Sequence, residues 1–224
     1  MMKTVTILGL LTLIAAAPSG PNKIPPTTVI TVSPAITGTV AFFPIFDIIR
    51  LQGGDLQSTC SFTTSENLEW QRAFAEFQLP VDPSRISRAT LHVIEPSSGW
   101  SATPLPTDVH EVSLYPGDLV VDTSDYDVPV ISVGTLETDA NDDPVNRFFE
   151  FDVTRAIHRM HKTIVGMRIK LQVDPDQPCS EFQQAGSAFG EFYNYPPTLE
   201  IEFGAPKKNP KVEGPSDPVA PRVE

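Results

Sequence analysis

Cysteine is scarce in this chain, and the short motifs that carry out chemistry in many enzymes are absent from it. The 224 residues include two cysteines, Cys60 and Cys179, so no C-x-x-C pair exists. The sequence also lacks an H-E-x-x-H zinc motif, a G-x-S-x-G nucleophile turn and a glycine-rich phosphate loop. These absences disfavour the common metalloprotease, hydrolase and nucleotide-binding classes, and they favour a binding or structural protein.

Basic residues are also few. The chain has 16 Lys and Arg against 28 Asp and Glu, which gives a formal net charge of −12. Because so acidic a surface repels phosphate backbones, we expect no nucleic-acid partner. Beyond the first 20 residues, no apolar run approaches the length needed to cross a bilayer, so we expect no membrane span.

The two ends of the chain differ in composition from its middle. Residues 1–20 have the layout of a secretory signal peptide, with Lys3, an apolar run from Val5 to Ala17 and then small residues. This layout predicts cleavage, export and a secreted, extracellular or cell-surface location. Residues 21–27 indicate a flexible lead, and the proline-rich residues 205–224 indicate a disordered tail.

Export bears on the two cysteines. An oxidising compartment favours a disulfide between Cys60 and Cys179, and a pair of buried free thiols is the alternative.

Residues 28–204 mostly alternate apolar and polar residues with a period of two, which is typical of strands with one buried face. The segment "VGMRIKLQV" shows it most cleanly, and there the pattern predicts that Arg168, Lys170 and Gln172 face outward. We count about ten such strands, and "TTVITV" and "TGTVAFF" near the start add a pair. The positions predicted to be buried are Ala73, Ala75, Phe77, Leu79, Ala89, Leu91, Val93, Val165, Met167, Ile169, Leu171, Val173, Leu199, Ile201 and Phe203.

One segment has a helical period instead. In "DVTRAIHRM", the apolar residues Val153, Ala156, Ile157 and Met160 recur at helical spacing, and Asp152 or Thr154 is suited to cap the first turn. This pattern predicts a short helix that closes one end of the fold.

The predicted helix turns four polar side chains to water: Arg155, His158, Arg159 and His161. A second candidate helix is "TSENLEWQR", residues 64–72. Together these patterns predict a single domain over residues 28–204, an all-β, jelly-roll-like antiparallel β-sandwich with one short capping helix.

Three segments in this order resemble the DNRLRE-type β-sandwich modules, which overlap carbohydrate-binding module family 96: "RAFAEFQLPVDPSRISRATLHV", "RFFEFDVTRAIH" and "GEFYNYPPTLEIEF". The resemblance covers about residues 60–204, and Met160 and His161 stand where family modules often carry a tryptophan. It implies an exported jelly roll that binds glycans or serves a structural role, without catalysis of its own.

Glycan binding requires exposed aromatic rings, because the C–H face of a sugar stacks on a ring. Four rings lie outside the alternating core pattern and are the candidate ligand-binding residues: Trp100, Tyr126, Tyr193 and Tyr195. The alternative is that each ring covers an edge of the sandwich.

Two acidic clusters supply the oxygen ligands that calcium prefers. One is "DTSDYD", with Asp122, Asp125 and Asp127, and the other is "DANDD", with Asp139, Asp142 and Asp143. The "DANDD" cluster lacks the glycine and the distant glutamate of an EF-hand loop. Calcium is therefore the candidate cofactor, and solvated turns rich in Asp and Asn are the alternative.

The histidines and several glutamates give weaker indications of a metal site or a catalytic site. His158 and His161 lie three positions apart without a third ligand for zinc, and His92 and His110 lie within predicted strands. "AGSAFG" indicates a turn. Glutamates near aromatic residues could form a glycosidase pair, although no hydrolase signature surrounds them: Glu66, Glu69, Glu76 and Glu191.

The first hypothesis is therefore a secreted, non-catalytic protein that resembles carbohydrate-binding modules and has a polysaccharide as its partner. The alternatives are a structural component of the cell surface or extracellular matrix, and a small glycan hydrolase.

Overall fold

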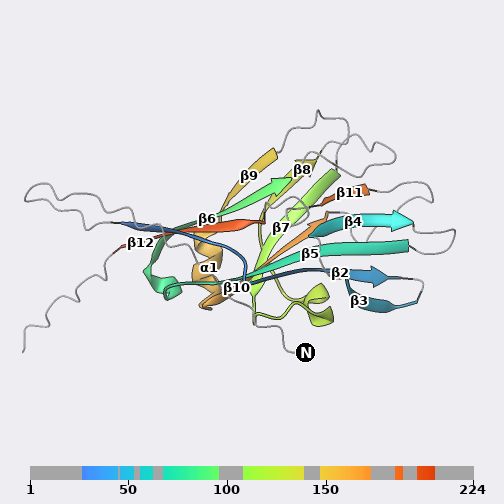
Figure 1. Cartoon of the computed structure of the whole chain (residues 1–224), viewed down its shortest axis with the longest axis horizontal. Coiled ribbons are helices and arrows are strands. Elements are labelled where there is room, and N and C mark those ends of the chain that lie inside the picture. Colours follow the sequence, from blue (N-terminus) through green and yellow to red (C-terminus); the bar gives the residue numbers. More distant parts are fainter. Residues whose placement is uncertain are drawn as a thin grey trace, which may run out of the picture.

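Two antiparallel β-sheets pack face to face, and one short α-helix lies at an end of the stack (Figure 1). The computed structural model describes residues 27–44, 46–52, 56–62, 68–95, 108–138, 147–172, 185–188 and 196–204. The all-β sandwich predicted from the alternation is confirmed. The predicted signal peptide, almost all of the predicted lead and the predicted tail lie outside the described residues.

The smaller sheet has four strands and supplies one wall of the core. Its alternation is as predicted, since Ala89, Leu91, Val93, Leu199 and Ile201 are buried. The strands run in the order β1 (Thr28–Val32), β12 (Thr198–Phe203), β6 (Ile86–Glu95) and β9 (Arg147–Asp152).

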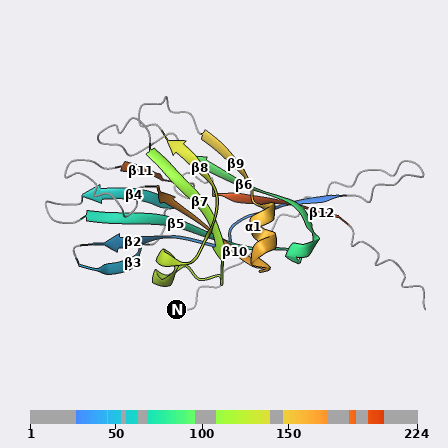
Figure 2. The same ribbon diagram turned by 180° about the vertical axis from the view of Figure 1, so that it is seen from behind.

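The larger sheet is built around β5. Its main path is β11 (Ala185–Ala188), β4 (Gln57–Phe62), β5 (Leu68–Gln78), β10 (Ile164–Leu171), β7 (Asp108–Pro116) and β8 (Ile131–Thr138). A hairpin of β2 (Ile36–Phe43) and β3 (Ile48–Gln52) joins this sheet through the pairing of β2 with β5 (Figure 2).

Strand β5 pairs with three strands, although a strand has two edges. The pairing with β2 covers Trp70–Glu76, that with β4 covers Leu68–Gln71, and that with β10 covers Ala73–Gln78. Because the β2 pairing overlaps both of the others, β4 and β10 must share the opposite edge of β5. The large sheet therefore divides where β4 and β10 meet.

Two local predictions are wrong at the ends of this sheet. The second candidate helix, residues 64–72, overlaps β5, which already begins at Leu68 and includes Trp70 and Arg72. The segment "AGSAFG" contributes strand β11, which pairs with β4, rather than a turn. In both places, pairing with distant strands outweighs the local preference of the sequence.

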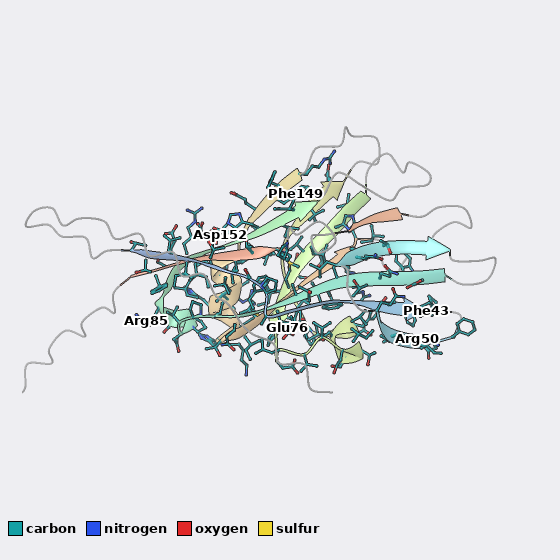
Figure 3. All side chains as sticks on the ribbon, viewed as in Figure 1. Phe43, Arg50, Glu76, Arg85, Phe149 and Asp152 are labelled. Carbon is teal, nitrogen blue, oxygen red and sulfur yellow. The ribbon has the colours of Figure 1, made fainter. Side chains whose placement is uncertain are left out.

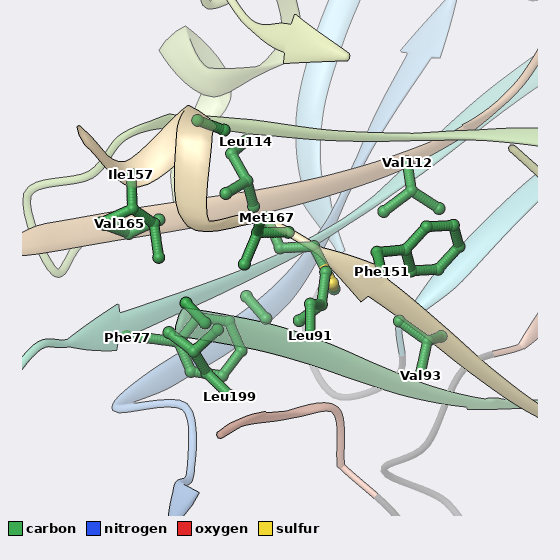
Figure 4. Packing of buried hydrophobic residues seen from close by; sticks show 14 of the residues in the cluster. Phe77, Leu91, Val93, Val112, Leu114, Phe151, Ile157, Val165, Met167 and Leu199 are labelled. Carbon is green, nitrogen blue, oxygen red and sulfur yellow. The ribbon is translucent and has the colours of Figure 1, made fainter. Parts of the chain in front are cut away.

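The main core fills the space between the sheets (Figure 4). The large sheet contributes Phe77, Leu114 and Met167, and the small sheet contributes Leu91 and Leu199. The predicted inward residues of β10 and β5 that lie in the described part are all buried. This agreement follows from the period-two alternation, which places every second side chain on one face.

Helix α1 (Thr154–Met160) closes one end of this core, as predicted. Ile157 is fully buried, and Val153, at the N-cap position, donates its backbone N–H to the carbonyl of Ala89 at 2.9 Å. Asp152 accepts from the N–H of Thr154 at 3.0 Å, so the expected capping residue does stabilise the first turn. Among the helices of the described part, none is long and apolar enough to cross a membrane.

One residue of the helix differs from its prediction. His158 is half-buried and donates from Nε2 to the carbonyl of Ile86 at 2.9 Å, so it does not face open water.

The outer face of the large sheet is also covered. The segment Gly117–Val130, here called the cover loop, contains the short 3₁₀ helix η2 (Thr123–Asp127) and places Val121 and Tyr126 against Phe74, Tyr115 and Val40. The prediction that Arg168 faces outward to solvent is therefore wrong: it is 6% exposed, because the cover loop lies over its face of β10.

Residues packed between the large sheet and the cover loop, here called the second layer, leave no space for a side chain at Gly166 of β10. A Cβ there would lie 2.1 Å from the ring of Tyr115. We expect Gly166→Ala to lower the free energy of unfolding by about 1 to 3 kcal/mol in chemical denaturation, because a packed ring must move. Gly204→Ala is the matched control, since nothing lies within 4 Å of its Cβ position. Equal stability of the two variants would contradict the packing described.

Candidate functional site on the outer face of the small sheet

The alternation that buries one face of the small sheet turns the other face outward. Across β9, β6 and β12 the outward side chains form rows, because paired residues share a face. The rows are Phe148 with Ile94, then Glu150 with His92 and Thr198, then Asp152 with Thr90 and Glu200. This outer face of the small sheet is the candidate site.

Phe148 is the aromatic residue of this face, and its exposed fraction is 71%. Sequence reasoning missed it, although a signal was present. In "RFFEFD" the period of two allows Phe149 and Phe151 to share the buried face, so Phe148 must point the other way. Figure 3 labels Phe149 and Asp152 on this strand.

The row beside Phe148 is polar. His92 Nδ1 lies 3.4 Å from Glu150 Oε1, and further along the sheet Arg88 lies 3.6 Å from Glu202. Thr90 is buried, whereas Thr198 is partly exposed. A ring beside carboxylates, a hydroxyl and an imidazole is suited to holding a hydroxyl-rich ligand by stacking and hydrogen bonds.

The carboxylate of Asp152 is poorly suited to acid catalysis. The hydroxyl and backbone N–H of Thr154 donate to it, and these hydrogen bonds lower the pKa of Asp152. A glycosidase general acid needs a raised pKa, so the shift at Asp152 has the wrong sign for that role.

Two of the glutamates considered for hydrolysis lie in the large sheet and support its structure. Glu69 is buried and accepts hydrogen bonds from the amides of Gln52 and Gln71. Glu76, labelled in Figure 3, is fully buried, and its Oε2 accepts from the backbone N–H groups of Asp118 and Leu119. Burial raises the pKa of Glu76. Glu66 and Glu191 lie outside the described residues.

A serine and a histidine meet inside the large sheet. Ser58 Oγ lies 2.9 Å from His110 Nδ1, and both side chains are fully buried. Burial lowers the pKa of His110 to about 3, so the imidazole is neutral at neutral pH. A nucleophile pair must reach its substrate, and this one has no exposed surface.

Tyr126 was expected to be an exposed stacking ring, and that expectation is wrong. Its exposed fraction is 3%, because the cover loop turns this ring toward the large sheet, with the guanidinium of Arg72 3.6 Å from the ring centroid. Arg72 and Arg168 also donate to its carbonyl oxygen. The other three candidate rings, Trp100, Tyr193 and Tyr195, lie outside the described residues.

The first acidic cluster comprises two residues of η2 and its N-cap residue Asp122, and each carboxylate has a protein partner. Asp122 accepts from the N–H of Ser124 at 2.7 Å, Asp125 accepts from the N–H of Asp122 at 2.9 Å, and Asp127 lies 3.2 Å from Arg72. Burial and nearby Glu76 raise the pKa of Asp125 to about 6.

Calcium binding by these residues stays a prediction. Within the segments that the structure describes, no three His, Cys, Asp or Glu side chains are grouped to hold a metal. The second cluster, Asp139, Asp142 and Asp143, lies outside them.

Cys60 lies on β4 and is fully buried. The described part of the chain contains no free cysteine. Cys179 lies outside the described residues, so the pairing of Cys60 with Cys179 stays a prediction.

Comparisons with known proteins give little beyond this geometry. No family model matches the chain, and no curated protein matches it. It is similar to a solved structure of the stem and receptor binding domain of the spike protein P1 from bacteriophage PM2, at 6% identity, with 84% of this chain and 100% of that chain covered. The TM-score is 0.26, and a likeness at that level carries no argument about fold or function.

The buried ring of Tyr126 and the exposed ring of Phe148 should contribute differently to the free energy of unfolding. We expect Tyr126→Ala to lower the free energy of unfolding by about 3 to 5 kcal/mol, because it empties the space under the cover loop. Phe148→Ala should change it by no more than about 0.5 kcal/mol. Urea denaturation of both variants measures this, and a neutral Tyr126→Ala would show that the ring is not packed as described.

Proposed function

We propose that this chain is a secreted, non-catalytic protein of the carbohydrate-binding-module type, which binds a polysaccharide through the outer face of its small sheet. The observation that carries the proposal is the exposed ring of Phe148 beside the polar row of His92 and Glu150. A sugar presents a C–H face that can pack on the ring and hydroxyls that can exchange hydrogen bonds with the row.

The ends of the neighbouring strands support this location. Glu95, at the end of β6, pairs with Arg147, at the start of β9, and β12 begins at Thr198 opposite His92. In the sequence, Trp100 follows β6, the Asp139–Asp143 cluster precedes β9, and Tyr193 and Tyr195 precede β12. The segments that hold these candidate residues therefore attach to the same end of the small sheet, next to Phe148.

The non-catalytic part of the proposal is supported by the roles of the described carboxylates. Glu69 and Glu76 are buried and hydrogen-bonded within the large sheet, and hydrogen bonds lower the pKa of Asp152. Export is supported by the signal-like first 20 residues and by the resemblance to exported DNRLRE-type modules. Calcium, held by the acidic clusters, has a structural role in this proposal.

Glycan binding can be tested on an array of polysaccharides, with and without EDTA. We expect wild-type protein to be retained on at least one glycan and Phe148→Ala to bind it at least about tenfold more weakly, a loss of about 1.4 kcal/mol. Phe46→Ala is the matched control, because Phe46 is also an exposed ring, at 56%, but lies in the β2–β3 hairpin. Retention that EDTA reduces would implicate the structural calcium.

The other outcomes point to the alternative functions. No retention of the wild type on any glycan would reject the proposal and favour a structural component of the cell surface or matrix. Release of sugar products from the panel would instead support a small hydrolase. Equal losses in the Phe148 and Phe46 variants would place binding elsewhere.

Export predicts a disulfide. We expect peptide mapping of protein purified from the secreted fraction, without reductant, to recover Cys60 and Cys179 in one linked fragment that reduction separates. The reason is that an oxidising compartment supplies an oxidant that takes two electrons and two protons from a pair of thiols as their sulfurs join. Recovery of both cysteines as free thiols would contradict the exported state.

A further inference from the structure

The charge of the outer face of the small sheet limits which polysaccharide it can hold. Strands β9 and β12 turn four carboxylates to this face: Glu150, Asp152, Glu200 and Glu202. The basic side chains on this face of the described strands are Arg88 and His92 of β6, and each lies beside a glutamate. Strand β1 adds no charge, since its outward residues are Val29 and Thr31. The face is therefore acidic even with His92 protonated, because four carboxylates outnumber two basic groups.

The other described arginines near this sheet point away from the face or lie at its far end. Arg147, next to Phe148 on β9, donates to the carbonyl oxygen of Glu137 in the large sheet at 3.2 Å. The arginines of α1 and of the short 3₁₀ helix η1 (Pro83–Arg85) lie at the opposite end from Phe148, because η1 precedes β6 and α1 follows β9. Positive charge is thus sparse around the exposed ring.

The sequence of the segments that attach beside Phe148 is acidic as well. Residues 96–107, 139–146 and 189–195 contain no Lys or Arg, and their acidic residues are Asp139, Asp142, Asp143 and Glu191. The whole chain has a formal net charge of −12. A polyanionic glycan is therefore repelled both by the face and by the field of the whole molecule.

The carboxylates follow Phe148 along the face. Glu150 lies two positions further on β9, a spacing of about 7 Å, and its side chain is 68% exposed. Asp152 follows at the same spacing, and Glu200 lies in its row on β12. Hydrogen bonds from Thr154 lower the pKa of Asp152, so this group stays ionised in mild acid. A polysaccharide that packs on Phe148 and runs along the face passes these carboxylates in turn.

We propose that the ligand of this face is a polysaccharide of amino sugars with free ammonium groups, and not a polyuronate or a sulfated glycan. This inference rests on the proposed function and names the ligand class of its site. One sugar packs on Phe148, and ammonium groups of the following sugars donate to Glu150 and Glu200 in charge-assisted hydrogen bonds. Each exposed pair contributes little alone, so the selectivity comes from several carboxylates contacted by one chain.

Titration calorimetry with chitosan oligosaccharides measures this preference. The reference ligand is the same oligosaccharides after N-acetylation, which keeps the sugar backbone and removes the charge. At about pH 6, where carboxylates and sugar ammonium groups are both ionised, we expect the amino form to bind at least about tenfold more tightly. Raising the salt concentration from about 0.05 to about 0.5 M should weaken binding of the amino form much more than that of the acetylated form, since salt screens charges.

Variants locate the charge that is responsible. Glu150→Gln and Glu200→Gln should each reduce the preference for the amino form about two- to fivefold. Phe148→Ala should weaken binding of both forms, because both present the same C–H face to the ring. Asp47→Asn is the matched control: it removes one exposed carboxylate from the β2–β3 hairpin, where the φ of 50° suits asparagine, and it should leave the preference unchanged.

The outcomes separate this inference from the function on which it rests. Equal or tighter binding of the acetylated form, or of polygalacturonate with or without calcium, would overturn the amino-sugar assignment while glycan binding remains. Retention on another glycan of the array without binding of the amino form would do the same. A preference that falls equally in Asp47→Asn and Glu150→Gln would show that the charge of the whole chain attracts the ligand, which also overturns the inference. Failure of every glycan to bind would reject the proposed function and this inference together.

Discussion

Strand β5 is buried on both of its faces, and the rest of the structure depends on this. One face supplies Ala73, Ala75 and Phe77 to the core between the sheets, and the other supplies Phe74 to the second layer beneath the cover loop. A strand with two buried faces must bury the polar residues of its sequence as well, here Glu69, Gln71, Arg72 and Glu76. Each is retained because it bonds to another element.

These buried polar groups determine how the layers are held together. Glu76 fixes the start of the cover loop through two backbone N–H groups, and Arg72 fixes its other end through the carbonyl oxygen of Tyr126. The buried hydrogen bond between His110 and Ser58 likewise joins β7 to β4 within the large sheet. Each of these groups is buried, so a substitution at any of them affects how a layer is attached.

The small sheet differs because its outer face carries exposed side chains. The same alternation that sends Phe149 and Phe151 inward leaves Phe148 as an exposed ring, and the strand pairing brings His92 and Glu150 next to it. The chain thus separates a large sheet, in which polar groups serve stability, from a small sheet, on which they are available to a ligand. That division supports the proposed binding role of the small sheet, and it explains why His110, Glu69 and Glu76 in the large sheet are shielded from a ligand.

The sequence by itself determined which residues point into the core between the sheets. Leu91, Met167 and Ile201 alternate with polar neighbours, and Ala156 and Ile157 recur at helical spacing, so the strands and the single helix at the end of the core could be predicted. Only the tertiary structure decided which polar residues are buried. Arg168 follows the same alternation as an exposed residue, yet the cover loop packs on it. Tyr126 lies in an acidic turn of that loop, yet its ring is buried because it packs on the large sheet. Alternation indicates which face of a strand a residue occupies. It does not indicate whether another part of the chain packs on that face.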